Sequence, residues 1–161
     1  MAAMALPLRE LSVTVQREAV SAQMAYWSLA EDVGQKRFQF VLWLKTRTLN
    51  SAMERLVEKQ QSLLDLLRQG PQAQFGPEVF LKIANDLGNV VSLTNSFIDE
   101  AYDMPVDCLS VWSPRLEKIS DLNSYLDNFA ESFRIAADEA CTALLADMAN
   151  KITADALTPA H

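Results

Sequence analysis

Residues 76–101 read GPEVFLKIANDLGNVVSLTNSFIDEA, and this stretch decides the expected fold most clearly. Proline is tolerated at the first position of a helix, and an acid beside it meets the positive end of the helix dipole, so Pro77 and Glu78 predict a helix start. The apolar residues that follow recur at steps of three, four or seven, which places them on one helical face. They are Phe80, Ile83, Leu87, Val90, Phe97 and Ala101. The segment therefore predicts an amphipathic helix.

The same apolar spacing recurs on both sides of this segment, so the sequence predicts an all-α protein with four long helices. Gly34 and the pair Gly70-Pro71 are expected to end the first two helices, and Ser113-Pro114 to start the last one. The sequence leaves open whether the first two helices are continuous through Gly34. The expected helices span about 8–33, 35–69, 77–101 and 114–153, with a flexible tail from about 154.

Chain length and loop length favour one compact arrangement of these helices. The 161 residues match the usual size of one domain, so a single helical domain over residues 1–161 is expected. Short links make consecutive helices antiparallel neighbours, which predicts an up-down-up-down bundle. The second and fourth helices are the longest, so part of one of them should project beyond the bundle or bend over its end.

Composition limits the partners that the chain is expected to bind. The net charge is −7, which disfavours nucleic acid because phosphate binding relies on a positive field. The stretch from Lys36 to Arg68 has seven basic and three acidic residues, a net of +4, and we interpret it as a helix that balances acidic neighbours. The longest apolar stretch, Phe38–Leu44, is far below the roughly 20 residues that span a bilayer. With no basic leader at the N-terminus, a cytoplasmic protein without a transmembrane segment is expected.

The residue types exclude most catalytic and metal chemistry. His161, the last residue, is the one histidine, so di-iron, zinc and hydrolase-triad sites lack their ligands or bases. Cys108 and Cys141 are not in a CxxC spacing, and no glycine-rich phosphate loop is present. We therefore expect no catalytic residue, no cofactor and no metal, and we expect that the protein is not an enzyme.

Carboxylates are the remaining candidates for acid and base chemistry. Asp127 and Glu131 lie one turn apart in the expected fourth helix, a spacing that is common on solvated helix faces. Asp99, Glu100 and Asp103 crowd the end of the third helix, where acids are mildly unfavourable. Their spacing matches no calcium loop, so we interpret them as a solvated helix end near Arg115.

One surface is apolar where a simple bundle helix would be polar. On a helical wheel at 100° per residue, one group of apolar residues lies roughly 160° from the inner stripe of the first helix. A second group lies off the inner line of the second helix. A hairpin at Gly34 would merge the two groups into one patch, unless the long fourth helix covers it. The seven residues are Val13, Val20, Met24, Trp27, Phe40, Trp43 and Leu44.

This patch leads to the function that the sequence predicts. Large exposed apolar surfaces with Trp and Met usually mark an interface. We expect a non-enzymatic helical interaction module that presents an apolar helix face to a protein partner and self-associates as a homodimer. The alternative is a bundle that binds an apolar small molecule or a lipid surface through Trp27, Phe40 and Trp43. No motif in the sequence identifies the partner.

Overall fold

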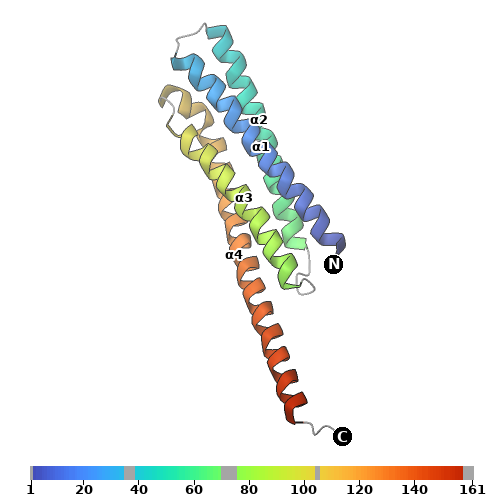
Figure 1. Ribbon diagram of the computed structural model, residues 1–161. Helices are drawn as coiled ribbons and strands as arrows, with labels where there is room; N and C mark the ends of the chain where they lie inside the picture. Colours follow the sequence, from blue (N-terminus) through green and yellow to red (C-terminus); the bar gives the residue numbers. More distant parts are fainter. Residues whose placement is uncertain (1, 35–38, 70–75, 104–105, 158–161) are drawn as a thin grey trace.

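The computed structural model contains four α-helices packed side by side, with no strand in the part of the chain that it describes (Figure 1). It describes the backbone of residues 2–34, 39–69, 76–103 and 106–157, and the side chains of 6–33, 41–69, 76–103 and 114–156. The helices are α1 Ala2–Gly34, α2 Gln39–Gln69, α3 Pro77–Ala101 and α4 Val106–Leu157. The all-α bundle predicted from the sequence is confirmed.

Helix α3 has the bounds that its capping residues and apolar spacing predict. Gly76 is extended, with φ −74° and ψ 166°, and Pro77 opens the first turn. The backbone N–H groups of Val79 and Phe80 both donate to the carbonyl of Gly76 at 3.1 Å. At the other end, the N–H of Tyr102 donates to the carbonyl of Ile98 at 3.0 Å. The six residues expected on its inner face are all buried.

Two other helices begin earlier than the sequence predicts. Helix α1 begins at Ala2 and runs through Pro7, and α4 begins at Val106 and runs through Pro114 to Leu157. The predicted start at Pro114 is therefore wrong, because a proline inside a helix costs one hydrogen bond and a bend but need not end the helix. Figure 1 shows the first turns of α4 set at an angle to its straight remainder. The predicted start of the second helix at Gln35 lies outside the described residues.

The bundle consists of two antiparallel hairpins. Helix α1 packs against α2 and α3, and α4 packs against α3 and α2, so α1 and α4 occupy opposite corners. The ion pair between Glu18 and Arg55, at 3.3 Å, is one of the links within the first hairpin. The amide of Gln23 donates to the hydroxyl of Ser96 at 3.1 Å and links the two hairpins through α1 and α3, which run parallel. Consecutive helices alternate in direction as expected, but α2 and α3 lie at opposite corners rather than side by side.

Helix α4 extends beyond the end of the bundle. Its buried side ends at Phe133 and Ala137, and every residue from Cys141 to Ala156 is exposed. Figure 1 shows this part of α4 extending beyond the other three helices, at the end of the bundle where α1 begins. We call residues 138–156 the arm; 19 helical residues span about 28 Å. The expected projection is thus on α4. Leu144 continues the spacing of the buried residues of α4, seven positions after Ala137, but is exposed because no other helix reaches it.

Candidate functional site

Six of the seven predicted interface residues have described side chains, and all six are exposed. Their exposed fractions lie between 40% for Val20 and 59% for Met24. Phe40 belongs to α2, but its side chain lies outside the described residues. The alternative in which the fourth helix covers the outer face of α1 does not hold, because α4 is at the opposite corner of the bundle. The role of these residues as an interface stays a prediction.

On α1 the exposed apolar residues form a regular seam. Leu6, Val13, Val20 and Trp27 recur every seven residues, the spacing with which packed helices meet along one line. Met24 lies beside this line. We call these five residues the α1 outer stripe; from Leu6 to Trp27 it is about 31 Å long. Leu6 was missed because the helix was expected to start at residue 8, although its spacing from Val13 was a usable signal.

The first half of the stripe is a shallow groove rather than a flat surface. Its volume is about 390 Å³, and it opens to solvent. The lining combines two apolar side chains with two arginines and one acid. The residues that line it are Leu6, Arg9, Glu10, Val13, Thr14 and Arg17. The groove therefore offers an apolar floor with a cationic edge.

Contacts with α3 fix the orientation of the stripe. The indole Nε1 of Trp27 donates to the carboxylate of Glu100, and the guanidinium of Arg9 lies 3.5 Å from the carboxylate of Asp86. Burial, followed by the charges of Glu100 and Asp103, raises the pKa of the neighbouring Tyr26. At least one acid at the end of α3 is therefore engaged by α1.

The exposed residues of α2 form a separate surface. The guanidinium of Arg47 lies 5.0 Å from the ring centroid of Trp43, a cation–π arrangement. Leu44 lines a second shallow groove of about 380 Å³ together with Arg47 and Arg55. This surface is aromatic and basic, unlike the apolar stripe of α1.

Charged pairs run along the boundary between α1 and α2. Lys45 pairs with Asp32, and Arg55 lies 3.3 Å from Glu18. These four residues join the two helices of the hairpin, so their charges lie between the outer surfaces of α1 and α2. The expected single patch is therefore divided into the α1 outer stripe and the cluster around Trp43.

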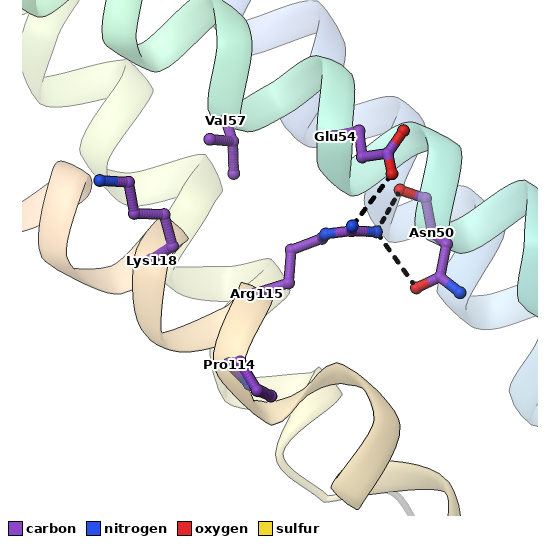
Figure 2. Close-up of a pocket in the computed structure, with 6 residues that line it drawn as sticks. All are labelled: Asn50, Glu54, Val57, Pro114, Arg115 and Lys118. Atoms are coloured by element: carbon purple, nitrogen blue, oxygen red, sulfur yellow. Dashed lines mark hydrogen bonds and ion pairs between the residues drawn. The ribbon is translucent and has the colours of Figure 1, made fainter.

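A third concave surface lies between α2 and α4 (Figure 2). This groove has a volume of about 590 Å³ and is lined by Asn50, Glu54, Val57, Pro114, Arg115 and Lys118. Figure 2 shows Arg115 reaching from α4 to α2, where Nη1 donates to the carbonyl of Asn50 at 3.2 Å and Nη2 lies 2.9 Å from a carboxylate oxygen of Glu54. Arg115 thus links α4 to α2 and does not neutralise the acids at the end of α3.

This contact of Arg115 could not be predicted from the sequence, because an arginine after a proline does not specify which helix it meets. Since the guanidinium is already paired with Glu54, we interpret the groove as a packing feature. The carboxylates considered for catalysis, Asp127 and Glu131, are exposed, and Glu131 pairs with Arg134. Over the described residues, no group of three or more His, Cys, Asp or Glu is placed to hold a metal ion.

None of the described helices combines the length and apolar content that a membrane crossing requires. Comparison of the chain with known protein families, curated proteins and solved structures finds no match. The interpretation of the surface therefore rests on its own geometry and chemistry. The α1 outer stripe is a surface that the core does not use and that carries several large apolar side chains at regular spacing.

Proposed function

We propose that this chain is a non-enzymatic helical interaction module that self-associates through the α1 outer stripe. The observation that supports it is the two-sided character of α1. One side of the helix is buried from Leu8 to Leu29, and the opposite side carries five large apolar residues with about half of their surface in water. A helix that only closed its own bundle would be polar on that side.

The energetics favour covering the stripe. Removing apolar surface from water is favourable by about 25 cal/mol per Å² before the costs of association are subtracted. Trp27 and Met24 are residue types enriched at protein interfaces, and Arg17 is a cationic edge residue of the kind found at their rims. A twofold dimer is the commonest closed assembly, because one self-complementary surface then serves both subunits.

The test is the mass in solution at micromolar concentration. The wild type should have about twice the chain mass of 18.0 kDa by light scattering. Val20→Glu, in the middle of the stripe, should shift the protein toward monomer while the helical circular dichroism stays unchanged. Leu81→Glu is the matched control, because Leu81 is an exposed apolar residue on α3, 49% exposed, outside the stripe. It should leave the dimer intact.

Trp27→Glu is a poorer probe, because it would place a second carboxylate beside Glu100. A wild type that has the mass of one chain at every concentration would contradict self-association. If that monomer instead bound anionic lipid vesicles with a shift in tryptophan fluorescence, the lipid-surface alternative would replace this proposal.

A further inference from the structure

The arm carries an apolar stripe that nothing in the bundle covers. Leu144, Leu145, Met148 and Ile152 are between 52% and 66% exposed. They continue the buried side of α4, since Leu144 and Met148 follow the buried Ala137 at steps of seven and four. The face that packs into the core therefore runs on for several turns with no helix against it. We call these four residues the arm stripe.

We propose that the arm stripe binds the α1 outer stripe of a second copy of this chain, so that two copies exchange arms about a twofold axis. The inference rests on the proposed self-association and names the surface that the α1 outer stripe meets. Its occupant is a second copy because geometry, charge and area each favour that pairing.

The geometry follows from the opposite corners of α1 and α4. Neighbouring helices pack about 8–10 Å apart, so the diagonal from α4 to α1 is about 13 Å. The arm leaves the bundle at the end where α1 begins (Figure 1). Its stripe continues the buried side of α4 by spacing, so it lies on the side toward α1. An inverted second copy, placed end to end with the first and shifted sideways, brings its α1 outer stripe against this arm.

The same twofold arrangement also places the arm of the second copy against the α1 outer stripe of the first. The α1 outer stripe of the first copy faces away from its own α4, which is the side where the arm of the inverted copy passes. Both arms are then covered at once, and each runs parallel to the α1 that it contacts. The lengths agree, since the arm is about 28 Å long and the α1 outer stripe about 31 Å.

Charge distinguishes this pairing from a contact between two arms. The arm has four acids, Asp138, Glu139, Asp147 and Asp155, and one base, Lys151, so its net charge is −3. Two arms packed together would repel each other. The groove of the α1 outer stripe instead has two arginines and one glutamate among its lining residues; Arg9 also contacts Asp86 of α3, and Arg17 is the second arginine. An acidic helix on a cationic edge is the favourable combination.

The area is sufficient for a stable dimer. The α1 outer stripe and the arm stripe together have nine large apolar side chains, about half exposed. The dimer has two equivalent contacts, and each would cover all nine of these side chains. Together the two contacts would bury roughly 800 Å² of apolar surface. Apolar atoms make up about 57% of an interface, so the total is about 1,400 Å², within the range of about 1,200–2,000 Å² for stable complexes.

The test uses one full-length variant in each stripe and their mixture. Met148→Glu alters the arm stripe, and Val20→Glu alters the α1 outer stripe. Each alone should weaken dimerisation about tenfold or more, because both contacts are damaged. An equal mixture should form a heterodimer tighter than either homodimer, since the arm of the Val20→Glu chain still meets an intact stripe on the Met148→Glu chain. Sedimentation velocity with one fluorescently labelled variant measures this directly.

Asn150→Glu is the matched control, because Asn150 is exposed on the side of the arm opposite Met148. It adds the same charge and should leave the dimer unchanged. Circular dichroism should show the same helix content for each variant as for the wild type. Ile152→Lys serves as a second arm variant.

The outcomes separate this inference from the proposed function. If Met148→Glu stays dimeric and Val20→Glu does not, arm exchange is refuted while association through the α1 outer stripe stands. If Val20→Glu stays dimeric and Met148→Glu does not, the arms pair with each other, and both proposals are refuted. A mixture no tighter than its components refutes arm exchange, and a monomeric wild type refutes both.

Discussion

Replacing Phe133 by alanine tests where the core of the bundle ends. Phe133 is 1% exposed and is the last large buried residue of α4 before the arm. Its ring centroid lies 5.6 Å from that of Phe80 on α3 and 6.5 Å from that of Phe129. The substitution would remove the ring that closes α3 against α4 and leave a cavity between the two helices.

The cost follows from that burial. Truncating a fully buried phenylalanine typically destabilises a protein by about 3–5 kcal/mol, the sum of lost transfer free energy and a cavity. The tilted pair with Phe80 is part of that loss, because aromatic pairs contribute about 0.5–1.5 kcal/mol beyond their area. For a chain of this size, 1 kcal/mol shifts the melting temperature by about 2–4 °C, so a fall of roughly 6–20 °C is expected.

Urea unfolding followed by circular dichroism at one fixed protein concentration measures the effect, since association makes stability concentration-dependent. Tyr125→Ala is the control, because Tyr125 is an exposed aromatic residue of the same helix. Its loss should cost well under half as much, chiefly the contact with the guanidinium of Arg68 at 5.7 Å. A loss below about 1 kcal/mol for Phe133→Ala would refute the closed packing of α3 and α4 at this level.

Three further predictions follow from individual side chains. Gly88→Ala should stabilise α3 by about 0.5–1 kcal/mol in urea unfolding, because the new Cβ meets only Nη2 of Arg134 at an ordinary 3.8 Å; a loss of stability would contradict this. Thr94→Val should raise the melting temperature, since the buried hydroxyl of Thr94 has no hydrogen-bond partner in the described part of the chain; a lower melting temperature would indicate a hidden partner. Burial raises the pKa of Tyr26 above 10.0, so its contribution to stability is present below pH 10.0 and is lost as the pH rises through the folded pKa. The urea midpoint of Tyr26→Phe should therefore fall less steeply than that of the wild type at alkaline pH, and parallel curves would contradict the assignment.

The sequence predicted best where several local signals agree. The bounds of α3 follow from Pro77 and Glu78, which together favour a helix start, and from apolar steps that end at Ala101. The prediction from Pro114 was wrong because a proline can stand either at the start of a helix or at a bend inside one. The surrounding fold decides between these two positions. The position of Val13 and Val20 on the side of the helix away from the core was also predicted, whereas the sequence left open whether the fourth helix covers that side.

Relations between helices were not predictable from stripes alone. An apolar face predicts that a helix packs against a neighbour, but it does not identify that neighbour. The diagonal placement of α2 and α3 was therefore missed. The same limit explains Leu144, whose spacing places it on the inner side of a helix that has run past its neighbours. It explains Arg115 as well, because the acid that it meets, Glu54, is 61 positions away in the sequence.

The unbroken helix of α4 has a consequence for how the arm is kept ordered. Starting a helix in water is costly, whereas adding a residue to an existing one is nearly neutral, so a separate peptide of the arm would first have to form a costly first turn. In this chain the bundle supplies the first turns, and the arm extends them without a new nucleation step. Amide exchange should therefore quicken progressively from Ala137 toward Leu157, as the helix frays from its free end. A partner that covers the arm would slow that exchange most at the tip.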